Sequence, residues 1–296
     1  MSLFATTGTR ERDGYRDERR LTGARTAGTR VFVAQSVVLI RMDIRLFGSP
    51  SPDPFLSAVD LFETEYDLEK PVHVSVRDDP DERTWAAHYD DRHELNISRQ
   101  AATSAMAREL VLHELSHMAR NEERHASHVQ STEEALYLAL SGNSVERRKL
   151  AHCYQIANHM KDIYADDITL SLAPAEKLVH FLESELARAV AANPGPSPWP
   201  DSRLVTADAD PEITAVNAAF ALALVERHDL IDDDHRIYDL AHAAADDAPN
   251  VELPAFKRRF RSLAADPTES DYRKALVDVT RAYAVGTGTG GSAAAD

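Results

Sequence analysis

Residues Leu110 to Arg120 read Leu-Val-Leu-His-Glu-Leu-Ser-His-Met-Ala-Arg, and this stretch predicts a metal-binding helix. It contains the pattern His-Glu-x-x-His at His113, Glu114 and His117. Side chains four positions apart lie on the same face of a helix, one turn apart, so these two histidines can bind one metal ion together. Glu114 is rotated by about 100° from His113, which lets its carboxylate accept a proton from water at the metal without being a ligand.

The same pattern can arise by chance in a chain with 13 His and many Glu, as two solvated histidines on a charged helix. The flanking residues argue against that alternative, because they are apolar and leave almost no charge between Glu109 and Arg120. These apolar neighbours are Met106, Leu110, Val111, Leu112, Leu115 and Met118. A helix this apolar is half-buried, and buried polar groups need partners. We therefore expect a metal site.

Composition limits the classes of partner. The 296 residues are 43% hydrophobic, which is enough for one large domain or two modest ones. A formal charge of -16 at pH 7 argues against nucleic acid and anionic membrane surfaces as partners. The single cysteine, Cys153, excludes an intramolecular disulfide and suits a reducing compartment, so we predict a cytoplasmic protein.

The basic residues are unusual, because Lys occupies just six positions and Arg supplies the rest of the 33 basic side chains. Abundant Asp, Ala and Val with scarce Lys resembles the proteins of salt-loving, halophilic archaea, in which an acidic surface keeps proteins in solution at high salt. The alternative is an ordinary acidic cytosolic protein.

Both ends of the chain differ from its middle. Residues 1–41 contain eight Arg, four acidic residues and much Thr and Gly without apolar periodicity, which predicts a disordered segment. The apolar run Val31–Ile40 is too short to cross a membrane. We expect Met42 to begin the native protein, so that residues 1–41 are a mis-called start or a dispensable arm. Residues 286–296 are predicted to form a flexible tail.

The hydrophobic periodicity between these ends predicts two regions joined by a Pro-rich linker at 193–210. The first region, 42–192, is expected to contain a helix at 54–66, strands at 72–76, 84–89 and 94–98, the motif helix at 103–120, a loop at 121–131, and helices at 132–140, 145–170 and 174–192. The second region, 211–285, is expected to contain helices at 211–228, 234–246, 252–264 and 269–285, without a chemical motif.

The order of helix, three short strands and motif helix resembles the N-terminal half of the zincin metallopeptidases. The resemblance implies an α+β, mainly α fold: a small three-stranded sheet with the active-site helix, followed by a helical C-terminal half. A metzincin would have Gly and His at the positions that Arg120 and Glu123 occupy, so that branch does not fit.

The third ligand is implied by a second motif, Asp162-Ile163-Tyr164-Ala165-Asp166. It resembles the Glu-x-x-Ala-Asp element of the gluzincin peptidases, in which the Glu binds zinc and the Asp orients a ligand histidine. By that resemblance Asp162 is the third ligand and Asp166 its partner. The shorter Asp in place of Glu departs from the family pattern and puts activity in doubt more than metal binding.

Alternatives for the third ligand remain open from the sequence. Asp162 and Asp166 can be solvated acids of an acidic protein, or Asp166 can itself be the ligand. Glu133 and Glu134 on the short helix between the two motifs are further candidates, on ligand type and reach alone.

Gluzincins also place a Tyr or His to stabilise the oxyanion of the tetrahedral intermediate. Tyr164, His159 and Tyr154 are the candidates for that role. The stretch Glu94–Ser98 is expected to be the edge strand that pairs with an extended peptide. His88 and His93 are expected to lie on the surface of a hairpin.

Together these features predict a zinc-dependent metallopeptidase that hydrolyses a peptide or protein substrate. Zn²⁺ would be bound by His113, His117 and Asp162, with Glu114 as the general base. Three alternatives stay open: an amide hydrolase acting on a non-peptide substrate, a non-catalytic regulatory or scaffold protein with the same fold, and a structural metal site closed by His125 or His128. The sequence does not determine the oligomeric state.

Overall fold

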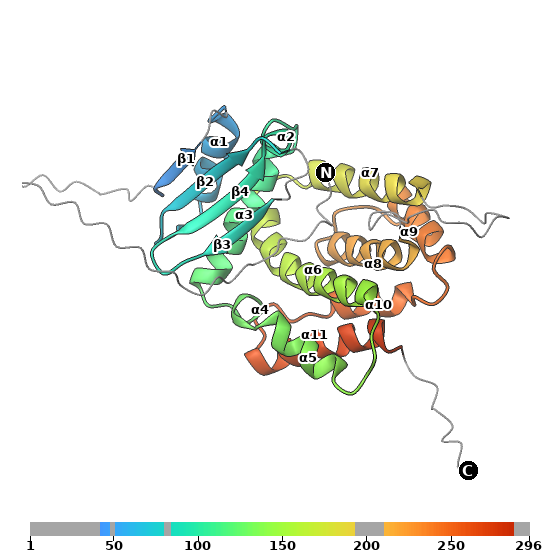
Figure 1. Ribbon diagram of the computed structural model, residues 1–296. Helices are drawn as coiled ribbons and strands as arrows, with labels where there is room; N and C mark the ends of the chain where they lie inside the picture. Colours follow the sequence, from blue (N-terminus) through green and yellow to red (C-terminus); the bar gives the residue numbers. More distant parts are fainter. Residues whose placement is uncertain (1–41, 48–50, 80–83, 193–209, 287–296) are drawn as a thin grey trace, which may run out of the picture.

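A small sheet and its helices form one side of the molecule, and a group of longer helices forms the other (Figure 1). The computed structural model describes residues 42–47, 51–79, 84–192 and 210–286. In chain order the elements are β1 (Ile44–Phe47), α1 (Asp53–Phe62), β2 (Val72–Arg77), β3 (Trp85–His88), β4 (His93–Ser98), α2 (Arg99–Ala102), α3 (Ala107–Glu122), α4 (Ala126–Val129), α5 (Thr132–Leu140), α6 (Arg147–Leu172), α7 (Glu176–Ala192), α8 (Pro211–Arg227), α9 (Arg236–Asp246), α10 (Leu253–Arg261) and α11 (Glu269–Ala284). The predicted α+β, mainly α class is confirmed.

The sheet has four strands among the described residues, so the prediction of three was wrong. The additional strand, β1, pairs in parallel with β2 and aligns Ile44 with Val72. Like β3 it has four residues, but no hairpin partner follows it in the sequence to reveal a strand. Pairing with β2 is what makes this segment a strand.

The strand order β1-β2-β4-β3 also corrects the prediction for Glu94–Ser98. This stretch belongs to β4, which lies inside the sheet between its parallel neighbour β2 and its antiparallel neighbour β3. The hairpin of β3 and β4 was predicted correctly, but the pairing of β2 with β4 depends on a crossover that the sequence does not display. The strand at this edge of the sheet is β3.

The stretch predicted as a loop at 121–131 is partly helical. Helix α3 continues to Glu122, and Arg124 then adopts the left-handed conformation with φ of 55°. The short helix α4 follows, with His125 as its N-cap, because the ring of His125 accepts a hydrogen bond from the backbone N–H of Ser127. A capped turn of this kind has no apolar periodicity by which to recognise it.

The buried apolar side chains form two clusters, and α6 contributes to both. The first cluster lies between the sheet, α1 and α3, and includes Leu95, Leu112 and Ile168. The second joins α6 to the helices of the C-terminal half, and includes Ile156 and Phe220. Helix α6 therefore connects the motif helix to the second half of the chain.

Three predicted segments, residues 1–41, 193–209 and 287–296, lie outside the described residues. Within the described part of the chain, no helix combines the length and the hydropathy that crossing a membrane requires.

Candidate metal centre

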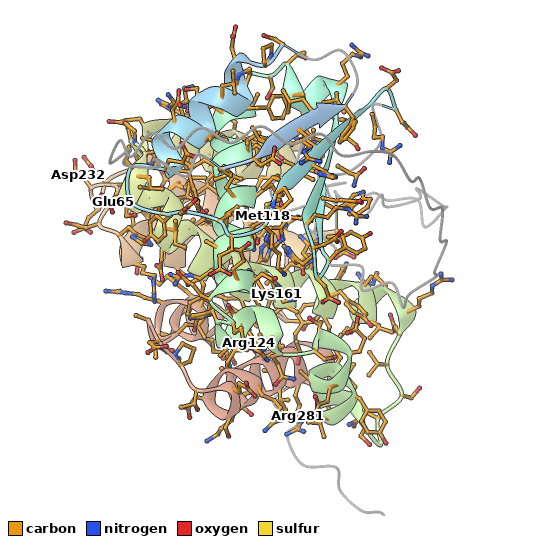
Figure 2. All side chains as sticks on the ribbon, turned by 90° about the vertical axis from the view of Figure 1, so that its left-hand side faces the viewer. Glu65, Met118, Arg124, Lys161, Asp232 and Arg281 are labelled. Atoms are coloured by element: carbon orange, nitrogen blue, oxygen red, sulfur yellow. The ribbon has the colours of Figure 1, made fainter. Side chains whose placement is uncertain are left out.

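Helix α3 buries all three residues of the first motif. His113, Glu114 and His117 are 4%, 0% and 5% exposed, respectively. The helix packs against α6, which carries the second motif. Figure 2 labels Met118 of α3 and Lys161 of α6, which mark the two helices on either side of the centre.

Three ligand-type atoms converge between α3 and α6. The Nε2 atoms of His113 and His117 are 3.0 Å apart. Oδ1 of Asp162 lies 3.2 Å from Nε2 of His117 and 3.8 Å from Nε2 of His113. Ligand atoms about 2.1 Å from one tetrahedral zinc are separated by about 3.4 Å, so these spacings fit a single zinc ion. The structure brings these three predicted ligands together, and all three are buried.

Asp166 occupies the position expected of an orienting partner. Its Oδ1 lies 2.7 Å from Nδ1 of His113, the ring nitrogen opposite to the one in the cluster. A carboxylate at that nitrogen holds the proton on Nδ1 and leaves the lone pair of Nε2 for a metal. Because Asp166 is bonded on the outer side of His113, it is not placed to act as the third ligand.

The other ligand candidates do not join the cluster. Glu133 accepts a hydrogen bond from Ser131 at the start of α5, and Glu134 lies near Gln130 and Arg273. His128 faces Nδ1 of His117 rather than Nε2. His125 makes its ring contact with Ser127.

Glu114 is fully buried, and neither of its carboxylate oxygens has a hydrogen-bond partner among the described residues. Burial raises the pKa of Glu114, although the neighbouring His117 and His113 act in the opposite direction. A buried carboxyl group without a hydrogen-bond partner costs folding free energy, and a catalytic role is one explanation for keeping such a group. Its position beside the cluster is the one that a general base requires.

The charge of the centre favours a cation. Burial lowers the pKa of His113, but the charge and hydrogen bond of Asp166, together with Asp162, outweigh burial and raise it to about 9. Burial acts to raise the pKa of Asp162, but contacts with His117 and His159 hold it below its usual range. The chain thus gathers more negative than positive groups here, and a bound cation would balance them.

The candidates for oxyanion stabilisation have other contacts. Nδ1 of His159 lies 3.5 Å from Oδ2 of Asp162, and its Nε2 lies 2.9 Å from Oδ1 of Asn217, so His159 lies between Asn217 and the predicted third ligand. Tyr164 is buried against the ring of His125. Tyr154 is exposed on α6.

His93 is not a surface residue of the hairpin, which corrects that prediction, and His88 is half-buried. His93 is fully buried and its Nε2 donates to Glu122 at 2.9 Å, while its Nδ1 lies 2.8 Å from Nδ1 of His88. Burial, together with nearby His93, His117 and Lys161, lowers the pKa of His88 to about 3. The sequence could have indicated the burial of His93, because alternation along the strand places it on the same face as the apolar Leu95 and Ile97.

A second group of ligand-type side chains consists of His152, Asp210 and Glu212. Arg148 already bonds to both carboxylates, and Tyr283 contacts the ring of His152. The guanidinium group supplies the positive charge that a metal would otherwise bring. We therefore assign this group to the packing of α6, α8 and α11.

Comparison with known proteins identifies the family. Residues 42–285 match a family of unknown function, DUF5781. The chain belongs to this family. No curated protein and no solved structure was found to match it.

Proposed function

We propose that this member of DUF5781 is a zinc-dependent metallopeptidase with a zincin-like active site. The observation that carries the proposal is the convergence of Nε2 of His113, Nε2 of His117 and Oδ1 of Asp162, with the unpartnered carboxylate of Glu114 beside them. Three protein ligands with a further position open are typical of catalytic rather than structural zinc.

Each residue of the centre has a separate role in the proposed hydrolysis. Zn²⁺ bound by the three atoms would polarise a substrate carbonyl and lower the pKa of water. Glu114 accepts a proton from the attacking water and delivers it to the leaving amine. Asp166 holds the ring of His113, and His159 holds the carboxylate of Asp162.

The short side chain of Asp162 is compatible with this function because α3 and α6 are held close together. Ser116 and Thr169 are small, buried residues whose hydroxyl oxygens lie 3.0 Å apart across the two helices. Arg120 of α3 donates from Nε to the backbone carbonyl of Tyr164 on α6 at 3.0 Å. A close approach of the helices brings the carboxylate to the histidines without the extra methylene of a Glu.

The edge strand β3 supports a peptide as the substrate. It is antiparallel to β4, is the last strand in the order of the described sheet, and packs against α3. An extended peptide could add to this edge through backbone hydrogen bonds and lie along the motif helix.

The test combines metal content with activity. We expect one zinc per chain in the wild type and loss of zinc in His117→Ala and Asp162→Ala, measured by elemental analysis after reconstitution. His152→Ala, which removes a buried histidine outside the centre, is the control and keeps its zinc. A wild-type chain without zinc overturns the proposal, and zinc retained in Asp162→Ala excludes that residue as a ligand.

Glu114→Gln separates catalysis from structural binding. This variant keeps zinc but loses about 10²- to 10⁴-fold in hydrolysis, the usual contribution of a general base. Assays on unstructured peptides and on non-peptide amides identify the substrate class. Unchanged hydrolysis in Glu114→Gln would exclude the proposed role of this residue.

A further inference from the structure

A row of hydrogen bonds connects His117 to the short helix α4. Nδ1 of His117 lies 2.8 Å from Nε2 of His128, and Nδ1 of His128 lies 2.7 Å from Oγ of Ser127. The same Oγ lies 2.7 Å from Nδ1 of His125. Ser127 is fully buried, His125 is 9% exposed and His128 is half-buried, so the outer part of the row lies in the protein interior.

At the outer end of the row, a backbone N–H group determines which atoms donate and which accept the hydrogen bonds. The N–H of Ser127 donates to Nδ1 of His125 at 3.3 Å, and a ring nitrogen that accepts carries no proton. The hydroxyl group of Ser127 must therefore donate to that nitrogen as well, and its oxygen is left to accept from Nδ1–H of His128.

The same reasoning assigns the donor and acceptor nitrogens of His128 and His117. A neutral imidazole has one N–H, so a His128 ring that donates from Nδ1 accepts at Nε2. Nδ1–H of His117 consequently donates to His128, and Nε2 of His117 carries a lone pair that faces His113 and Asp162.

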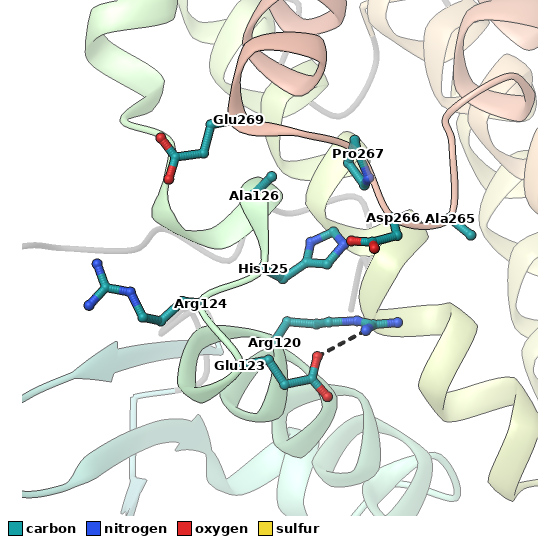
Figure 3. Close-up of a pocket in the computed structure, with 9 residues that line it drawn as sticks. All are labelled: Arg120, Glu123, Arg124, His125, Ala126, Ala265, Asp266, Pro267 and Glu269. Atoms are coloured by element: carbon teal, nitrogen blue, oxygen red, sulfur yellow. Dashed lines mark hydrogen bonds and ion pairs between the residues drawn. The ribbon is translucent and has the colours of Figure 1, made fainter.

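The outer end of the row is anchored by the C-terminal half of the chain. The ring of His125 packs on Tyr164 with 4.5 Å between centroids. It also lines a pocket of about 320 Å³ together with Ala265, Asp266 and Pro267 from the connection between α10 and α11. Figure 3 shows the ring projecting from the segment before α4 toward that connection.

We propose that His128 is a positioning residue for His117, and that Ser127 and His125 set the tautomer of both rings. The two histidines of the motif are thus held differently: His113 by the carboxylate of Asp166, and His117 by a neutral imidazole. A neutral partner orients the ring without adding a further negative charge to a centre that already contains Glu114, Asp162 and Asp166. This inference rests on the proposed function, because it assigns the row to metal binding.

The experiment measures zinc affinity of the full chain by competition with a chelator. His128→Ala removes the acceptor, and we expect zinc binding about 10- to 100-fold weaker, as for other partners of metal-bound histidines. Ser127→Ala breaks the row one step further out and gives a smaller loss. His128→Gln restores an acceptor oxygen and recovers part of the affinity. His152→Ala loses a buried imidazole of the same kind outside the row and keeps wild-type affinity.

A second measurement reports the tautomer directly. Nitrogen-15 NMR of the metal-free chain should find the proton of His117 on Nδ1 in the wild type and shared between both ring nitrogens in His128→Ala. Wild-type zinc affinity in His128→Ala, or a proton on Nε2 of His117 in the wild type, overturns the inference and leaves the proposed function intact. A wild-type chain that takes up no zinc overturns both.

Discussion

Buried and half-buried histidines lie in and near the candidate metal centre, and hydrogen bonds determine which ring nitrogen of each one carries the proton. His93 donates from Nε2 to Glu122, so its Nδ1 accepts from Nδ1–H of His88. Nδ1 of His113 faces a carboxylate, and Nδ1 of His117 faces another imidazole. The consequence is a centre whose ring orientations are fixed before any metal binds, which lowers the cost of binding.

Acid should destabilise the protein through His88. Its pKa is about 3 in the folded chain and about 6.5 in the unfolded chain, so the unfolded chain binds more protons as the pH falls. The contribution of neutral His88 to the free energy of unfolding is present above pH 6.5 and is lost as the pH falls toward 3. At pH 5, protonation of this histidine in the unfolded chain lowers the free energy of unfolding by about 2 kcal/mol relative to its value at high pH.

His88→Gln tests this, because it removes the titrating group. The loss of unfolding free energy between pH 7 and pH 5, measured by urea denaturation, should be about 2 kcal/mol smaller than in the wild type. His180→Gln, on the exposed face of α7, serves as the control and should behave like the wild type. Equal pH dependence in the wild type and His88→Gln would contradict a neutral buried His88.

Among the elements, α6 contributes side chains to both apolar clusters. It carries Asp162 and Asp166 toward α3, and Ile156 and Ile163 into the core shared with the C-terminal helices. On another side it holds α8 through an ion pair between Asp167 and Arg227, in which Nε and Nη2 each contact a carboxylate oxygen at 2.8 Å. The position of Asp162, the proposed third ligand, therefore depends on packing around the whole helix.

Arg227→Met should destabilise the fold without removing a candidate metal ligand. It leaves the half-buried Asp167 with His228 as its ion-pair partner, and we expect the free energy of unfolding to fall by about 2 kcal/mol in thermal or urea denaturation. Arg236→Met breaks an exposed ion pair with Glu183 and should cost less than about 0.5 kcal/mol. Equal stability of the two variants would show that the ion pair between α6 and α8 contributes no more to the free energy of unfolding than an exposed ion pair.

Across the whole molecule, the two apolar clusters meet at α6, and the second of them extends from α4 to α11. The C-terminal half has no chemical motif, but it covers the face of α6 opposite the sheet and braces Asp162 through Asn217 and His159. The division of the chain at 193–210, predicted from its Pro-rich composition, stays a prediction. The helices on the two sides of that segment share one core.

A chain that ends at residue 192 should therefore fail to fold cooperatively. It lacks α8 to α11 and would expose the apolar face of α6 to water, at about 25 cal/mol for each Å². Circular dichroism during heating should show a broad transition for residues 42–192 and a sharp one for residues 42–286. A sharp transition in the shorter chain would show that its core is sufficient by itself.

The motif helix and most other helices could be predicted from the sequence, because their signals are local. The spacing of His113 and His117 places both rings on one face of a helix whatever its surroundings. The apolar periodicity of α5 to α11 likewise repeats within each helix and gave bounds within a few residues of those observed. The local spacing of Asp162 and Asp166 also indicated that both point to one side of α6.

Which side chains contact one another at the candidate centre was determined by the tertiary structure alone. Asp162 is separated from His117 by 45 positions, and the packing of α3 on α6 brings them within 3.2 Å. The order of the strands, the burial of His93 and the row from His117 to His125 likewise arise where segments contact one another. Such contacts depend on the packing of the whole core, which no single stretch of sequence records. The sequence by itself thus determined the motif and its helix, and the fold determined the complete centre.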